Sequence, residues 1–281
     1  MQEIKNQNFE GERALFKGEG ISIYGCNFDN GESPLKHSRN ITTEHSGFRW
    51  KYPFWYSKDI EINDCTFYEM ARAGIWYTEN VSVKNSIFIA QKALRRCKGI
   101  ALKNVKFMDA AETLWDCTDA DLKNVEVKGD YFGMNSSEVE ADGLFIDGNY
   151  CFDGGRYLTI RNSRLISKDA FWNCESVLCE NCYISGEYLG WNSKEMTFIN
   201  CTIESHQGLC FIDGLVLMNC KLINTDLAFE YSKDIEANLV GNVDSIKNPS
   251  GGVIRCGGVG ELIMQEDMVD TSETEIVINK E

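Results

Sequence analysis

The sequence predicts an all-β fold, a single-stranded right-handed parallel β-helix of about 12 coils with 19–21 residues in each. The first observation is a spacing: four asparagines follow one another at intervals of nineteen residues, each after an alternating pair of apolar residues. The second is that a small residue and an aliphatic residue follow each asparagine in the same order. A supersecondary unit that recurs at a fixed period is the signature of a solenoid. The four asparagines are Asn162, Asn181, Asn200 and Asn219.

Each repeat is interpreted as one coil. The alternating apolar residues predict a short strand with one buried face. Asparagine tolerates the left-handed backbone of a sharp turn, so it marks the corner after that strand. The small and aliphatic residues that follow predict a second strand directed back into the same core. If each coil climbs about 4.8 Å, the asparagine side chains stack into a ladder and pair their amides.

The repeat extends over most of the chain. Earlier corners carry Asn, Asp, Gly or His, which are the residue types suited to a tight or left-handed turn. His45 is therefore interpreted as a turn residue rather than a catalyst. The corners that precede the opening four asparagines are Asn6, Gly25, His45, Asp64, Asn85, Asn104, Asn124 and Gly143.

A third short segment, often aromatic, follows most corners by about ten residues, as in Phe54-Trp55-Tyr56 and Ile75-Trp76-Tyr77. Three strands in each coil indicate a right-handed β-helix. Intervals of 19–21 residues exclude the strict eighteen-residue left-handed β-helix. A sustained period of five is missing, which disfavours a pentapeptide-repeat prism, and the leucine-rich pattern L-x-x-L-x-L-x-x-N does not occur.

The predicted domain organisation has two parts. Residues 1–222 form the β-helix, of which 1–18 are an incomplete N-terminal coil. Beyond Asn219 the alternation slips by one residue, and Pro249-Ser250-Gly251-Gly252 interrupts the pattern. Residues 223–281 are therefore predicted to form irregular terminal coils and a C-terminal cap or tail, because an uncovered strand edge promotes aggregation.

Charge and composition limit the classes of partner. The chain of 281 residues has a formal net charge of −15, which argues against binding to nucleic acid or to an acidic membrane surface. No stretch is long and apolar enough to span a bilayer. The first residues, Met1-Gln2-Glu3-Ile4-Lys5, lack the pattern of a signal peptide, so we expect a cytoplasmic protein. The sequence predicts no cofactor.

Twelve cysteines are interpreted as core residues. Several share one position of the repeat with Ser86, Ser163 and Val105, and a position that accepts Cys, Ser or Val favours a small core side chain. Cys179 and Cys182 form a C-x-x-C pair, but Cys179 falls on the inward face of its strand. Packing is favoured over a zinc or redox site, and no metal site is predicted.

The order of strand, asparagine turn, strand, variable loop and strand resembles the pectin-lyase-like superfamily of right-handed parallel β-helices. The chain is most similar to a bacterial family with this fold that is catalogued as a domain of unknown function. The resemblance covers about residues 4–222 and implies a ligand groove on the outer face of the strand that follows the variable loop. The ordered catalytic elements of polygalacturonases and the calcium-binding aspartates of pectate lyases do not occur here.

That strand carries the predicted binding face. Its first residue is apolar and is expected to point inward, so the next residue points outward; Cys210 and Phe229 are included among the outward positions. A row of outward tryptophans is hard to explain as solvated surface. Aromatic rings with neighbouring polar groups hold sugar rings. The predicted substrate-binding residues are Trp55, Trp76, Arg95, Trp115, Asn135, Trp172, Asn173 and Trp191.

A gap in the tryptophan row is rich in carboxylates and is the predicted reaction site. The candidate catalytic residues are Asp116, Asp153 and Arg156. Asp116 and Asp153 are expected two coils apart, roughly 9–10 Å, near the upper limit for an inverting glycosidase. If the protein is an enzyme, it is then a hydrolase or lyase of polysaccharides or oligosaccharides.

The leading functional hypothesis is therefore carbohydrate binding or processing along the tryptophan face, with an oligosaccharide or other glycan as partner. The net charge favours a neutral or short glycan over polygalacturonate, unless Arg95, Arg96 and Arg156 gather the anion locally. The alternative is a non-catalytic scaffold whose tryptophan face binds another protein or forms a homo-oligomer.

Overall fold

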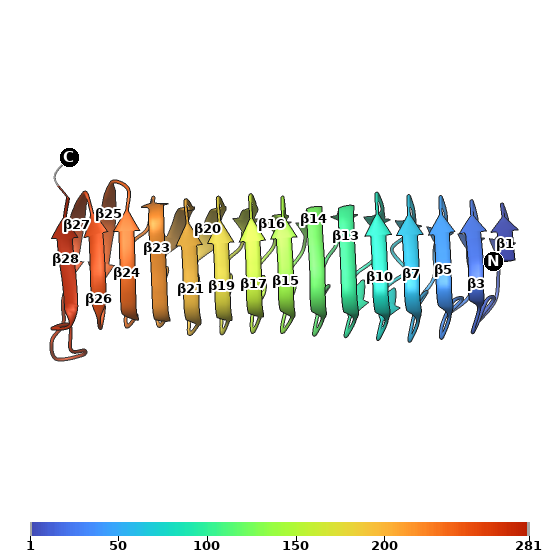
Figure 1. Ribbon diagram of the computed structural model, residues 1–281, viewed down its shortest axis with the longest axis horizontal. Helices are drawn as coiled ribbons and strands as arrows, with labels where there is room; N and C mark the ends of the chain where they lie inside the picture. Colours follow the sequence, from blue (N-terminus) through green and yellow to red (C-terminus); the bar gives the residue numbers. More distant parts are fainter. Residues whose placement is uncertain (1, 280–281) are drawn as a thin grey trace. The chain divides into compact units, whose positions relative to one another are not determined.

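The computed structural model describes residues 2–279, and within them every regular element is a β-strand. The chain divides into two compact units, Met1–Phe145 and Ile146–Glu281. In both units, parallel strands of successive turns pair in register (Figure 1). The fold is an all-β parallel β-solenoid, as the sequence predicts.

In the first unit, eight parallel strands, one from each turn, form the main sheet. Equivalent residues pair directly, so that Ile21 lies beside Ile41, and Ile41 beside Ile60. These inward side chains are buried, because alternation along each strand places every second residue in the core. The strands are β1 (Gln2–Lys5), β3 (Glu19–Tyr24), β5 (Arg39–Glu44), β7 (Lys58–Asn63), β10 (Glu79–Lys84), β13 (Lys98–Phe107), β14 (Thr118–Lys128) and β15 (Ser137–Asp142).

A second row of short strands follows the corner in each turn. Its phenylalanines stack inside the core, with ring centroids 4.8 Å apart for Phe48 and Phe67 and 4.2 Å apart for Phe67 and Phe88. These strands are β2 (Asn8–Phe9), β4 (Asn27–Phe28), β6 (Gly47–Phe48), β8 (Thr66–Phe67) and β11 (Ile87–Phe88), continued by the ends of β13 and β14. A third row contains the short pair β9 (Ile75–Trp76) and β12 (Leu94–Arg95).

The second unit repeats this arrangement. Its main strands are β17 (Arg156–Arg161), β19 (Glu175–Glu180), β21 (Lys194–Ile199), β23 (Asp213–Leu222), β24 (Lys233–Leu239), β26 (Gly252–Cys256) and β28 (Thr274–Ile278). Its other strands are β18 (Arg164–Ile166), β20 (Tyr183–Glu187), β22 (Thr202–His206), β25 (Asn242–Lys247) and β27 (Gly258–Ile263). Strand β16 (Phe145–Asp147) contains the boundary between the units.

The solenoid has about fifteen turns, so the predicted number of about 12 is wrong. The additional turns are those of β24, β26 and β28. The sequence of these turns looks irregular, because a register shift between Met218 and Cys220 displaces the alternation of apolar residues. Backbone hydrogen bonding nevertheless continues, and Ile235 pairs with Gly252. The right hand of the helix stays a prediction.

The predicted corners adopt the expected backbone. All twelve have positive φ, between 49° and 71°, and His45 with φ of 49° is confirmed as a turn residue. Amide side chains bridge neighbouring turns at several of these corners. The Nδ2 atom of Asn104 donates to Asn85 at 3.0 Å, and that of Asn219 donates to Asn200 at 2.8 Å. These asparagines lie on the surface of the corner.

The prediction that the cysteines are core residues is confirmed, because all twelve are free thiols and all are buried. Burial raises the pKa of Cys65 to about 11 and that of Cys151 to about 12. Cys179 and Cys182 of the C-x-x-C pair are likewise buried. A thiol in an apolar environment is a weak nucleophile, since only the thiolate reacts.

Candidate functional site

The tryptophan edge of the first unit is positioned by the third row of strands. Trp76 of β9 pairs with Arg95 of β12, and Arg95 bridges to Trp115. The amide of Tyr56 donates to the carbonyl of Trp76, which places Trp55 on the preceding turn of the same row. The structure therefore brings together four of the predicted binding residues, and all four are half-buried.

These side chains stack on one another. The rings of Trp55 and Trp76 are 5.2 Å apart with 6° between their planes. The Arg95 guanidinium carbon lies 4.7 Å from the Trp76 ring centroid and 4.8 Å from that of Trp115. Because each neighbour covers a flat ring face, these faces are directed along the stack. Stacking of a sugar ring on them would have to displace those contacts.

Polar contacts hold this stack in place. The indole N–H of Trp55 donates to the Ala73 carbonyl at 2.6 Å, and that of Trp76 donates to the Lys92 carbonyl at 2.7 Å. Arg95 forms an ion pair with Glu112 at 2.7 Å, which together with Lys92 lowers the pKa of that carboxyl against the effect of burial. Among residues 2–279, the buried Nε of Arg95 has no hydrogen-bond partner.

Two outward positions predicted from the sequence, Cys210 and Phe229, are wrong, and a third, Asn135, is exposed as predicted but lies outside the row. The amide of Asp116 donates to the Met134 carbonyl, so Met134 continues the row of Trp115 and Asn135 lies one residue further on, at an exposed turn with φ of 54°. Cys210 and Phe229 were expected to point outward, but both are fully buried. Because the loops differ in length, the residue that occupies the outward position changes from turn to turn. The alternation of apolar and polar residues within one short segment does not reveal that change.

The second unit has its own aromatic edge. Trp172 and Trp191 have ring centroids 6.1 Å apart and are tilted by 32°, and Trp191 lies 4.4 Å from Phe211 with a tilt of 43°. Phe211 is 37% exposed, so part of this edge faces solvent. Asn173 lies at the turn after Trp172, where its Nδ2 donates to Asp153 at 2.9 Å. Its binding role stays a prediction.

The predicted catalytic residues fall in both units. In the first unit, Asp116 lies at a turn with φ of 51° and pairs with Arg96 at 3.3 Å. In the second, Asp153 accepts the hydrogen bond from Asn173, and Arg156 at the start of β17 lies 3.8 Å from Glu175. The separation expected between Asp116 and Asp153 stays a prediction.

The sequence interpretation missed a buried carboxyl in the second unit. Asp169 is only 2% exposed, and within the described chain its Oδ1 has no hydrogen-bond partner. Burial raises its pKa against the effect of a hydrogen bond from Tyr150, and the nearby charge of Asp153 raises it further. In sequence, Lys168-Asp169 looks like an ordinary solvated pair, so no local signal marks this burial.

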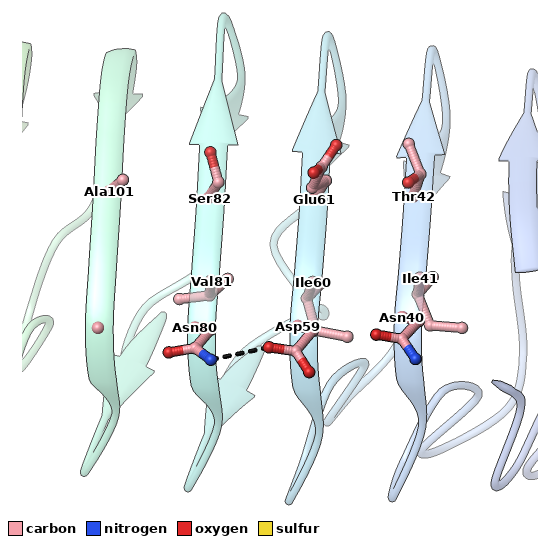
Figure 2. A pocket seen from close by; sticks show the side chains of 11 residues that line it. Asn40, Ile41, Thr42, Asp59, Ile60, Glu61, Asn80, Val81, Ser82 and Ala101 are labelled. Carbon is pink, nitrogen blue, oxygen red and sulfur yellow. Dashed lines mark hydrogen bonds between the residues drawn. The ribbon is translucent and has the colours of Figure 1, made fainter. Parts of the chain in front are cut away.

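A shallow groove of about 470 Å³ crosses the outer face of β5, β7, β10 and β13 (Figure 2). Asn40, Asp59 and Asn80 lie at one level of successive strands, and Nδ2 of Asn80 donates to Asp59 at 2.8 Å. The groove exists because its other outward side chains are mostly short. These are Thr42, Glu61, Ser82 and Ala101.

A second hollow of about 460 Å³ shares Asn40 and Asp59 with this groove and is bordered by aromatic rings. The rings of Tyr56 and Tyr77 stack 4.7 Å apart with 4° between their planes, and Tyr56 is 46% exposed. Lys58 pairs with Glu79 at 3.0 Å beside them. The two hollows thus form one polar groove, called the amide groove below, with a tyrosine border.

Within residues 2–279 there is no helix with the length and apolar character needed to cross a membrane. In the same range, no three His, Cys, Asp or Glu side chains converge as metal ligands would.

Fold and surface together define a parallel β-solenoid protein with stacked aromatic edges and a polar groove on one sheet. The chain belongs to the family described as "Protein of unknown function (DUF3737)", whose model matches residues 2–277. The similarity expected from the sequence, to a β-helix family of unknown function, is confirmed. A comparison with curated proteins finds no match to the chain.

Solved structures with similarity to the chain include three proteins that act on or bind glycans by their descriptions. The Azotobacter vinelandii mannuronan C-5 epimerase AlgE4 A-module is 9% identical, with 99% of this chain and 88% of that chain covered and a TM-score of 0.31. A mutant tailspike protein of E. coli bacteriophage HK620, in complex with pentasaccharide, is 11% identical, with 87% and 60% covered and a TM-score of 0.37.

The third is the Yersinia enterocolitica family 28 exopolygalacturonase, which is 9% identical, with 98% of this chain and 72% of that chain covered and a TM-score of 0.30. All three TM-scores are low. The family assignment therefore rests on the sequence match, and the function has to be argued from the residues of this chain.

Proposed function

We propose that the protein binds a carbohydrate chain in the amide groove of its first unit. The observation that carries the proposal is the groove floor, where amides and carboxylates repeat on successive strands beside the stacked Tyr56 and Tyr77. The hydroxyl groups of a sugar both donate and accept hydrogen bonds, so they can bind the amide nitrogens as well as the amide and carboxylate oxygens of the groove floor. Because Tyr56 and Tyr77 stack face to face, they offer a ligand their ring edges and hydroxyl groups at the border.

Binding to an oligosaccharide array, followed by calorimetric titration of the hits, tests this proposal. Replacing Asn80 by Ala or Tyr77 by Ala should weaken binding by about 1–2 kcal/mol, the range of one polar contact or one aromatic contact. The matched control is Asn200→Ala, which removes a surface amide in the second unit. The proposal that the groove binds carbohydrate would be refuted by an array without hits, or by an equal loss of affinity in Asn80→Ala and Asn200→Ala.

We propose Asp116, Asp153 and Arg156 as the catalytic residues. Asp169 is a further candidate acid in the second unit, because burial raises the pKa of its carboxyl. In the second unit, the Gly154 amide donates to the Trp172 carbonyl, so Trp172 lies on the turn after Asp153, and Trp172 and Trp191 are the proposed substrate contacts. Asp153→Asn should abolish release of reducing ends from a bound glycan while retaining binding, and unchanged turnover would remove Asp153 from the mechanism.

A non-catalytic scaffold is the second candidate. The supporting observation is the outer face of β19, β21 and β23, where Leu178, Ile199 and Val216 are partly exposed and Met218 is 45% exposed. Apolar side chains gathered on one outer sheet face are suited to association with a second copy. Light scattering would then detect a dimer that Met218→Lys dissociates, and a wild-type monomer at high concentration would eliminate this candidate.

A further inference from the structure

The first unit usually pairs opposite charges between successive turns. A basic side chain on one turn meets a carboxylate on an adjacent turn, about twenty residues away in sequence. Because in-register strands place equivalent residues side by side, such pairs offset charge along the solenoid. The pairs and their distances are Arg49–Asp29 at 3.2 Å, Lys51–Glu32 at 3.3 Å, Lys58–Glu79 at 3.0 Å, Lys92–Glu112 at 3.0 Å, Arg96–Asp116 at 3.3 Å and Lys106–Glu126 at 2.8 Å.

One row of the main sheet breaks this pattern. Lys84 pairs in register with Lys103, and Lys103 pairs in register with Lys123, so three like charges follow one another on β10, β13 and β14. All three are exposed. Lys123 has carboxylates beside it, Asp121 on its own strand at 2.6 Å and Asp142 in register on β15, so in the described chain Lys84 and Lys103 are the two lysines of the row without a neighbouring carboxylate partner. Within residues 2–279, no carboxylate lies within ion-pair distance of Lys84 or Lys103.

This arrangement costs stability in the free protein. Adjacent parallel strands lie about 4.8 Å apart, and like charges directly opposite each other on a sheet are destabilising. The chain has 43 acidic residues that could alternate with these lysines, as they do in the pairs above. A row of lysines in so acidic a protein is therefore better explained by a ligand than by stability.

The lysine row borders the amide groove. Ser82 and Ala101 line the groove, and Lys84 and Lys103 lie two residues further along the same strands on the same outer face. Two residues of extended strand span about 7 Å, which is within reach of a lysine side chain. A glycan in the groove would thus present one side to the floor and the other to the lysines.

We propose that Lys84, Lys103 and Lys123 form a subsite for the negatively charged groups of an acidic oligosaccharide held in the amide groove. The inference rests on the proposed carbohydrate function and adds the class of ligand. The net charge of the chain predicts a neutral glycan. The lysine row is positively charged although the whole chain is acidic, so an acidic glycan is proposed instead. Carboxylate and sulfate groups share the required chemistry, and both are tested below.

The experiment is calorimetric titration of three probes: oligogalacturonate, a sulfated carrageenan oligosaccharide and a neutral cello-oligosaccharide. The variant Lys84→Gln/Lys103→Gln removes the two unpaired charges. The control Lys168→Gln/Lys233→Gln removes two lysines that are ion-paired in the second unit, at 3.0 Å to Glu187 and 2.9 Å to Asp213. The expected result is an affinity about tenfold weaker for one or both acidic probes at low salt, with a shallower salt dependence, in the first variant alone.

Each outcome separates the subsite from the groove. Failure of both acidic probes to bind, or equal affinities in the two double variants, overturns the subsite. If the neutral probe then still binds in a manner sensitive to Asn80→Ala, the groove stands without the subsite. If an acidic probe needs the lysines but ignores Asn80→Ala, the lysines bind it and the groove proposal falls.

A stability measurement distinguishes a loss of binding caused by the changed charge from one caused by unfolding. Lys103→Glu restores alternation of charge with Lys84 and Lys123, so the thermal midpoint should rise by a few degrees while affinity for the acidic probe falls. A parallel fall in midpoint and affinity would instead assign Lys103 a structural role.

Discussion

The indole rings of Trp55 and Trp76 lie parallel, with centroids 5.2 Å apart and 6° between their planes. They come from successive turns and continue through Arg95 to Trp115. Both flat faces of Trp76, and the face of Trp55 and of Trp115 that is directed into the stack, are thereby occupied by neighbouring turns of the same chain. The aromatic edge of the first unit therefore contributes to cohesion between turns, whatever ligand it also contacts.

Replacing Trp76 by Ala should reduce the free energy of unfolding by about 2–4 kcal/mol, because it removes two stacking contacts and the hydrogen bond to the Lys92 carbonyl. Urea denaturation followed by circular dichroism measures the change. The control is Tyr157→Ala, since Tyr157 is 59% exposed and should cost little. Equal stability of the two variants would mean that the stack does not hold the turns together.

Replacing Asn181 by Leu should cost about 2–3 kcal/mol. Asn181 has φ of 54°, donates to Asn162 at 3.3 Å and accepts from Asn200 at 3.3 Å. Leucine loses both bonds and is strained in this conformation. Asn181→Gly loses the bonds but tolerates the backbone, so it should be the milder change. A Gly variant less stable than the Leu variant would contradict this account.

The thiols should be unreactive in the native state. Because all twelve cysteines are buried, Ellman's reagent at pH 8 should modify few or none in the folded protein and all twelve in urea. Rapid modification of Cys182 or Cys179 without denaturant would show that the C-x-x-C pair is accessible, and would reopen its redox interpretation.

Stability should decline at alkaline pH. The folded protein holds the pKa of Cys65 at about 11, above its ordinary value of 9.0. Above pH 9 the unfolded chain therefore loses a proton that the folded chain retains, so the stabilisation is complete below pH 9 and is lost as pH rises toward 11. Between pH 8 and pH 10.5 Cys65 should account for a loss of about 1–2 kcal/mol. Cys65→Ala should show a correspondingly smaller decline, and an identical decline would exclude this cause.

The solenoid and its corners can be predicted from the sequence because they depend on local preferences that repeat. Asn181 and His45 occupy left-handed turns, which the residue types and their spacing indicate without knowledge of the fold. The turns of β24, β26 and β28 could not be counted from the sequence, because a register shift after Met218 separates the backbone repeat from the side-chain alternation.

What the sequence by itself determined is thus the period, the inward face of each strand and the residues that turn the chain. Only the tertiary structure decided which side chains meet across turns: Asn80 with Asp59, Trp55 with Trp76, and Lys84 with Lys103. These partners lie 19–21 residues apart, and each loop that is longer or shorter by one residue changes which of them become neighbours. Lateral register follows from the sum of those loop lengths, so the groove and the lysine row emerge only when the turns are stacked.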